Sequence, residues 1–154
     1  MKILLDTTYL LPTFGIEVKG LTSEDILKLR SLVVDGNIKL YCSSIIWPEL
    51  LGKVFREINR QKRAENLDIK MAIRALFNPK FYKWIKPGRR SIELAYNLRR
   101  LGHPDMIDNI LYALSITRKM IFLSMDLDFK DFLVKRNFPI SSFLSHDELF
   151  ERLR

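Results

Sequence analysis

Short runs of apolar residues recur along the chain and predict the strands of a sheet. Residues 2–5, 38–42 and 120–125 are mostly apolar, and residues 81–85 form an aromatic run with one lysine. The clearest runs are apolar on both faces, which is typical of a parallel sheet that helices cover on both sides. Residues 139–141 are interpreted as a further strand at the sheet edge.

Segments with apolar residues every three or four positions alternate with these runs and predict helices. The predicted helices cover residues 23–34, 45–60, 68–77, 91–101, 105–119 and 129–135, with a closing helix from residue 145. Serine marks several of their starts, as N-caps do, and Ser145 with Glu148 has the form of a capping box. Residues 9–11 begin a helix or turn that Pro12 and Gly15 interrupt.

The alternation of strands and helices predicts the α/β class, as a three-layer α/β/α sandwich with a mainly parallel central sheet. The chain has 154 residues, which is the length of one domain, and it shows no internal repeat, low-complexity tract or linker. We therefore expect residues 1–154 to form a single domain.

The composition is that of an ordinary globular protein, with 47% hydrophobic and 29% charged residues. Apolar runs are too short to cross a bilayer and no charged-then-apolar leader opens the chain, so we expect a cytoplasmic protein without membrane partners. The single cysteine, Cys42, excludes an internal disulfide and a thiolate metal set. A formal net charge of +8 favours contact with phosphate backbones.

Four acidic residues stand where a parallel sheet binds its ligands. Asp6 and Asp126 follow apolar strands, while Glu49 and Asp108 fall in the first turns of predicted helices. Ligands of open α/β sheets bind beyond the carboxyl ends of the strands. The sequence therefore predicts that these four carboxylates share one crevice.

Clustered carboxylates repel one another and remain ionised together only when a cation neutralises them. Hard oxygen donors suit Mg²⁺ or Mn²⁺, which keep several waters and also bind phosphates. Such an ion lowers the pKa of a bound water, orients it toward a phosphodiester and stabilises the leaving oxygen. The predicted chemistry is that of a hydrolytic nuclease.

Each acid also has a purely structural interpretation. Asp6 alone suits an Asx turn as well as it suits a metal. Asp105 and Asp108 follow Pro104 and suit a helix N-terminus, whose dipole they complement. The remaining acids likewise suit a solvated turn or a helix start. Only the order and setting of the four acids favour the functional interpretation.

The segments around these acids resemble the PIN domain family. The resemblance rests on residues 3–8 (ILLDTT), 43–49 (SSIIWPE), 108–115 (DNILYALS) and 121–129 (IFLSMDLDF). The last segment looks like that family's strand, hydroxyl residue and Asp-x-Asp-Phe signature. The similarity spans nearly the whole chain, although residues 60–102 carry none of the signature.

That resemblance implies a metal-dependent endoribonuclease acting on single-stranded or structured RNA, with Mg²⁺ or Mn²⁺ held by Asp6, Glu49, Asp108 and Asp126. Members of the family are frequently dimeric, and frequently the toxin of a VapC-type toxin–antitoxin pair. The resemblance therefore predicts an antitoxin partner and a homodimer for this chain.

Supporting residues follow from the same resemblance. Thr8 matches a hydroxyl position that helps to hold the first acid, and Ser124 matches the hydroxyl before the last one. Asp128 lies at a position that sometimes joins the site, and Asp105 is a rival of Asp108 as a ligand. Pro48 and Tyr112 depart from the usual toxin pattern, which weakens the toxin assignment more than the fold.

Basic and aromatic residues are candidates for holding RNA. The basic candidates are Arg89, Arg90, Lys53 and Arg56, together with Arg60, Lys62, Arg63 and Lys86. Trp84, Tyr82 and Phe81 are candidates for stacking on bases, although aromatic clusters more often pack in a core. His103 and His146 have no visible partner for general-base catalysis and stay outside the catalytic set.

Other functions fit less well or stay open. A phosphatase of the haloacid dehalogenase type requires a second Asp two residues after its nucleophile and a Thr two further on, a pattern that neither Asp6 nor Asp126 begins. A Toprim-like nuclease requires a strand-end glutamate, whereas Glu49 stands beside Pro48. The alternative outside enzymes is a catalytically inactive PIN-fold protein that binds RNA or acts as a scaffold.

Overall fold

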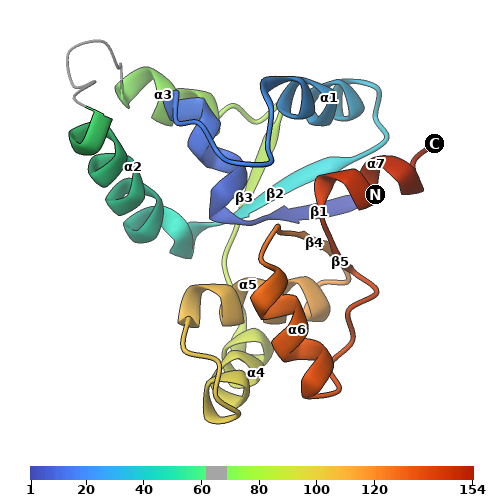
Figure 1. Cartoon of the computed structure of the whole chain (residues 1–154). Coiled ribbons are helices and arrows are strands. Elements are labelled where there is room, and N and C mark those ends of the chain that lie inside the picture. The colour runs from blue at the N-terminus through green and yellow to red at the C-terminus, as the bar shows by residue number, and fades with distance from the viewer. Residues whose placement is uncertain (62–68) are drawn as a thin grey trace.

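The computed structural model describes residues 1–61 and 69–154, so the predicted RNA contacts Lys62 and Arg63 lie outside the described residues. Five parallel strands form one sheet in the order β3-β2-β1-β4-β5. They are β1 (Lys2–Leu5), β2 (Lys39–Ser43), β3 (Tyr82–Ile85), β4 (Ile121–Leu123) and β5 (Phe143–Leu144). Helices cover both faces, with α1 and α3 above the sheet and α4, α5 and α6 below it in Figure 1. The predicted three-layer α/β/α class is confirmed.

Two short 3-10 helices and seven α-helices connect these strands in the described part of the chain. The 3-10 helices are η1 (Thr7–Phe14) and η2 (Ser44–Ile46). The α-helices are α1 (Ser23–Val34), α2 (Trp47–Gln61), α3 (Ile69–Leu76), α4 (Arg89–Arg100), α5 (Met106–Thr117), α6 (Leu127–Lys135) and α7 (His146–Arg152). None of the helices within the described ranges is long and apolar enough to cross a membrane.

The central strand β1 is buried on both faces because helices pack on each side of the sheet. Ile3 pairs with Leu40 of β2 on one side and with Ile121 of β4 on the other. Ile3 and Leu4, which point to opposite faces, are both fully buried. The chain leaves β1 toward β2 on one side and returns to β4 on the other, so the strand order reverses at β1. Open α/β sheets bind ligands at this kind of switch point.

The predicted edge strand at residues 139–141 was wrong, because β5 begins only at Phe143. Phe143 pairs with Phe122 of β4 in parallel register. Pro139 has no N–H to give to a ladder, and its carbonyl accepts a hydrogen bond from the Tyr112 hydroxyl at 2.7 Å. The apolar signal of this segment thus reflects packing under α5 rather than strand pairing.

The predicted bounds of α1 are confirmed, but two predicted serine N-caps were wrong, and α4 begins two residues before its predicted start. Thr22, rather than Ser23, is the N-cap of α1 and forms a capping box with Asp25. Gly88 precedes α4, whereas Ser91 is buried inside the first turn with its Oγ 2.7 Å from Thr117 Oγ1 of α5. Ser91 therefore resembles an N-cap in the sequence because it is a serine near a helix start, whereas its hydroxyl joins α4 to α5.

The capping box predicted for α7 is confirmed and allows a stability prediction. The Glu148 N–H donates to Ser145 Oγ at 3.2 Å, and the Ser145 N–H donates to the Glu148 carboxylate at 2.7 Å. Ser145→Ala should lower the free energy of unfolding by about 1 kcal/mol, because an N–H loses its acceptor. Chemical denaturation would measure this change. Ser145→Asp, which retains a capping oxygen, is the matched control, and an equal loss in both variants would contradict the assignment.

Candidate functional site

Asp6 lies at the carboxyl edge of the sheet, immediately after β1. Its N–H donates to the Leu123 carbonyl of β4 at 3.0 Å, which extends the ladder by one residue. The Ser124 hydroxyl donates to Asp6 Oδ2 at 2.9 Å. Asp6 is only 7% exposed. The end of β4 therefore fixes the orientation of a buried carboxylate at the end of β1.

Asp126 is joined to Asp6 through Ser124. The Asp126 N–H donates to Ser124 Oγ at 3.2 Å, while the same hydroxyl donates to Asp6. Asp126 is also the N-cap of α6, with Oδ1 accepting from the Phe129 N–H at 2.9 Å. One of the two carboxylate oxygens of Asp126 therefore caps a helix, which is the structural role that its sequence position also suggested.

Glu49 enters the same edge from the first turn of α2. The short helix η2 turns the chain after β2, and Pro48 is accommodated where its missing N–H costs nothing. Thr7 Oγ1 donates to Glu49 Oε2 at 2.8 Å, and Lys53 Nζ lies 2.6 Å from Oε1. Both oxygens of Glu49 are therefore engaged by other side chains.

Asp108 lies in the first turn of α5 and faces the other acids. Burial raises the pKa of Asp108 to about 8, and the negative charges of four neighbouring acids add to the rise. These neighbours are Asp6, Asp105, Asp126 and Glu49. The structure thus brings the four predicted site acids into one electrostatic neighbourhood, although they come from four separate parts of the sequence.

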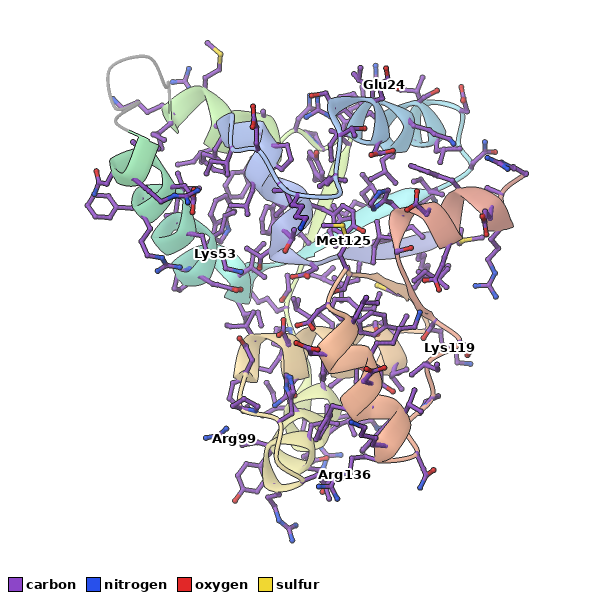
Figure 2. All side chains as sticks on the ribbon, in the orientation of Figure 1. Glu24, Lys53, Arg99, Lys119, Met125 and Arg136 are labelled. Atoms are coloured by element: carbon purple, nitrogen blue, oxygen red, sulfur yellow. The ribbon has the colours of Figure 1, made fainter. Side chains whose placement is uncertain are left out.

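Asp6 and Lys53 respond to the same neighbourhood. Burial raises the pKa of Asp6 to about 6, and the Ser124 hydrogen bond and the charge of Lys53 limit this rise. Burial disfavours the charged form of Lys53, but its bond to Glu49 and the charges of Glu49, Asp6 and Asp108 raise its pKa overall. Lys53 is therefore an internal counter-ion of the acids. Figure 2 shows it on α2 and shows Met125, which precedes Asp126, near the middle of the view.

The acids do not form a ready-made metal cage. Among residues 1–61 and 69–154, no three Asp, Glu, His or Cys side chains form a group that could hold a metal ion as they stand. Both carboxylate oxygens of Glu49 are already in contact with Thr7 and Lys53. Mg²⁺ commonly uses only one or two carboxylates and keeps its waters. The raised pKa values of Asp6 and Asp108 show that the protein alone stabilises their anions poorly.

The other predicted site residues take different positions. Asp105 is exposed and caps α5, with Oδ1 accepting from the Ile107 N–H at 2.8 Å and the Asp108 N–H at 3.1 Å. Asp128 is exposed in the first turn of α6. Thr8 makes no side-chain hydrogen bond to a residue that the structure describes, whereas its neighbour Thr7 contacts Glu49. The first-turn position of Asp108, rather than the cap position of Asp105, faces the cluster.

Ser43 was not predicted as a site residue, yet it lies beside Asp6. Leu4 pairs with Tyr41 across β1 and β2, and Asp6 and Ser43 each stand two residues further along their chains, at the same end of the sheet. Ser43 is fully buried, and its Oγ has no hydrogen-bond partner among the described residues. Buried hydroxyls rarely lack a partner, which adds a free oxygen donor to the edge that carries the acids.

A basic groove adjoins the acids through Lys53. It has a volume of about 410 Å³ and is bounded by α2 and the segment after η1. Its charged lining residues are Lys19, Lys53, Arg56, Arg60, Glu17 and Glu57. Arg60 pairs with Glu57 at 2.8 Å, and Arg56 is exposed. The groove therefore places cationic side chains, including the predicted Lys53 and Arg56, next to Glu49.

The remaining candidates for RNA contact differ in their accessibility. Arg89 and Arg90 are exposed at the start of α4, with Arg89 3.0 Å from the Glu93 carboxylate. Tyr82 is only 6% exposed, so stacking on a base is excluded for it. Trp84 is half-buried and stacks on Trp47, with ring centroids 4.9 Å apart. The sequence could not indicate this partner because it belongs to another element.

Both histidines have structural partners, in agreement with their exclusion from the catalytic set. His103 Nδ1 lies 2.8 Å from Asn109 Oδ1, and its ring stacks on Phe129 with centroids 4.2 Å apart. His146 is buried at the start of α7, and its Nδ1 lies 3.1 Å from the Tyr9 hydroxyl. These contacts account for both rings.

Comparison with known proteins adds no relative to this picture. No protein-family model matches the chain, and no curated protein matches it significantly. The resemblance to the PIN domain family accordingly stays a prediction from the quoted segments.

Proposed function

We propose that this protein is an Mg²⁺- or Mn²⁺-dependent endoribonuclease that hydrolyses phosphodiester bonds of single-stranded or structured RNA. The observation that carries the proposal is the junction of an acidic cluster with a basic groove. Lys53 belongs to both, since it contacts Glu49 and lines the groove. Acids suit a metal and its water, whereas cations suit the phosphates on either side of the bond that is cut.

The roles of the chain's own residues follow from their contacts. Asp6, Glu49, Asp108 and Asp126 would hold the cation, which supplies an activated water and neutralises charge on the phosphate. Ser124 orients Asp6 and also meets the backbone of Asp126. Arg56 and the other groove cations would hold the RNA strand without occupying the acids. Arg89 and Arg90 would bind phosphates near the start of α4.

A catalytically inactive RNA-binding or scaffold protein is the second candidate, and two observations favour it. Lys53 already neutralises Glu49 at 2.6 Å, and no three metal-binding side chains of the described residues are assembled. The basic groove serves RNA binding in either case. An antitoxin partner, a role as a toxin and a homodimer remain predictions from the family resemblance.

Metal removal separates the two candidates. Wild-type protein with Mn²⁺ should cut single-stranded RNA and leave a 5′-phosphate and a 3′-hydroxyl, because a water rather than the ribose 2′-hydroxyl attacks. EDTA should stop cleavage, and excess Mn²⁺ should restore it. Gel analysis with end-specific enzymes reads both bond cleavage and end chemistry. Cleavage that persists in EDTA, or no cleavage across a broad RNA set, would refute the nuclease proposal.

A further inference from the structure

Three aromatic side chains from separate elements stack against one another beside the acid-bearing edge. They are Trp47 at the start of α2, Phe77 just after α3 and Trp84 of β3. The Trp47 ring lies 5.4 Å from Phe77 and 4.9 Å from Trp84, with interplanar angles of 11° and 18°. The Phe77 and Trp84 centroids are 5.3 Å apart. We call these three residues the aromatic platform.

One ring of the platform is held by a hydrogen bond, and another is exposed to solvent. The Trp84 indole N–H donates to the Leu76 carbonyl at 2.8 Å, which anchors the ring to the end of α3. Trp47 and Trp84 are half-buried, whereas Phe77 is 54% exposed. An oriented ring with an accessible surface is what base stacking requires, because little side-chain entropy remains to be lost.

The segment that carries Phe77 and Trp84 has only positive charges. Residues 69–92, which run from α3 through β3 into α4, contain seven Lys and Arg and no Asp or Glu. The seven are Lys70, Arg74, Lys80, Lys83, Lys86, Arg89 and Arg90, and all seven are exposed. Aromatic rings among exposed cations form the combination that binds single-stranded nucleic acid, where cations follow the phosphates and rings take the bases.

The platform also lies at the carboxyl end of the sheet, where the acids lie. Trp47 stands two residues before Glu49 in the same first turn of α2. Trp84 pairs with Cys42, one residue before β2 ends and the chain turns toward Glu49. A base held by the platform would therefore belong to a nucleotide close to the acids.

We propose that the aromatic platform binds an unpaired nucleobase of an RNA strand whose phosphates lie along the basic segment 69–92. The proposal rests on the proposed function for its choice of RNA as the ligand. It adds a selectivity: the platform takes unpaired bases, so the protein binds single strands in preference to duplexes. It also changes the predicted stacking set, because Trp47 and Phe77 join Trp84, whereas Tyr82 is too buried to stack on a base.

Intrinsic fluorescence tests this proposal directly, because the chain has two tryptophans and both belong to the platform. The probe is a short oligoadenylate titrated into the full-length protein in EDTA, so that no cleavage takes place. We expect saturable quenching of tryptophan emission. A self-complementary RNA duplex of the same length should bind more weakly and quench little, since its bases are already stacked and paired.

Variants of Phe77 distinguish stacking from apolar packing. Phe77→Leu should weaken oligoadenylate binding about tenfold, as expected for one lost base–aromatic stack, while Phe77→Tyr should stay within about twofold of wild type. Tyr96→Leu is the matched control, because Tyr96 is 62% exposed on α4 and should be replaceable without effect. Circular dichroism checks that each variant is folded.

Several results would overturn the platform. They are oligoadenylate binding without quenching, equal quenching by the duplex, and equal affinity of the leucine and tyrosine variants. These outcomes are independent of the nuclease proposal, which depends on metal-dependent cleavage. Quenching without cleavage would leave the platform standing and refute the nuclease, whereas cleavage without quenching would do the reverse.

Discussion

Asp108→Asn should lower the rate of Mn²⁺-supported RNA cleavage roughly a hundredfold or more, the loss expected when a metal site loses one of its ligands. Asp108 is half-buried and feels the charges of Asp6, Asp126 and Glu49, so its carboxylate belongs to the acid cluster. Asparagine has nearly the same shape, so packing is retained while the charge is lost. Single-turnover cleavage measures the effect on the chemical step.

Asp105→Asn is the matched control, three residues away on the same helix. Asparagine is as good an N-cap as aspartate, so the bonds to the Ile107 and Asp108 N–H groups should survive. We expect its cleavage rate to stay within about twofold of wild type. A large loss in Asp105→Asn with little loss in Asp108→Asn would reverse the assignment of the ligand.

RNA affinity gives the second readout for this pair of variants. Removing a negative charge near the basic groove should leave RNA binding in EDTA unchanged or slightly stronger, because repulsion of the phosphates falls. Arg56→Ala should instead weaken binding, and Arg99→Ala should not, since Arg99 lies at the far lower end of the molecule in Figure 2. Parallel losses of binding and cleavage in Asp108→Asn would indicate misfolding rather than a lost ligand.

The sequence could predict the acidic edge because strand ends are local features. A buried apolar run specifies a strand, parallel strands end at one edge, and Asp6 follows β1 with no intervening residue. By the same reasoning, the sequence placed Glu49 and Asp108 in the first turns of helices. The fold class was therefore accessible from local patterns combined with one topological rule, and so was the electrostatic proximity of Asp108 to the other three acids.

Contacts between side chains distant in sequence were less accessible. Resemblance indicated Ser124, but its bond to Asp6 joins residues 118 positions apart. The resemblance indicated Thr8 as a support of Asp6, but it did not indicate Thr7, the first residue of η1, which donates to Glu49. The partner of Lys53 depends on the helical i,i+4 relation with Glu49, a signal that was present in the sequence.

The acid cluster should also make the stability of the cation-free protein fall as the pH rises from about 4 to about 8. The pKa of Asp108 is raised from 3.8 to about 8, and that of Asp6 to about 6. A raised carboxyl pKa means that the folded state binds the proton more tightly than the unfolded state. This contribution is complete below the unfolded pKa and is lost as the pH passes the folded pKa.

The pH window separates this effect from other groups with shifted pKa values. Asp25 and Glu148 have lowered pKa values, so their contributions are lost only on acidification below about pH 5. Cys42 and Tyr9 have raised values and matter only in alkaline solution. Between these limits each buried acid can change the free energy of unfolding by up to about 1.4 kcal/mol per pH unit.

Denaturant unfolding in EDTA at several pH values measures this dependence. The same measurement with Mg²⁺ in place of EDTA measures how much the ion stabilises the folded state. The ion binds the folded state and competes with protons, so its stabilising effect should grow as the pH rises toward 8. Asp108→Asn should flatten the pH dependence and reduce the effect of Mg²⁺, whereas Asp105→Asn should retain most of both. A wild-type protein whose stability is constant between pH 5 and 8 in EDTA would show that Lys53 alone neutralises the cluster, and the case for a cation at this edge would then be lost.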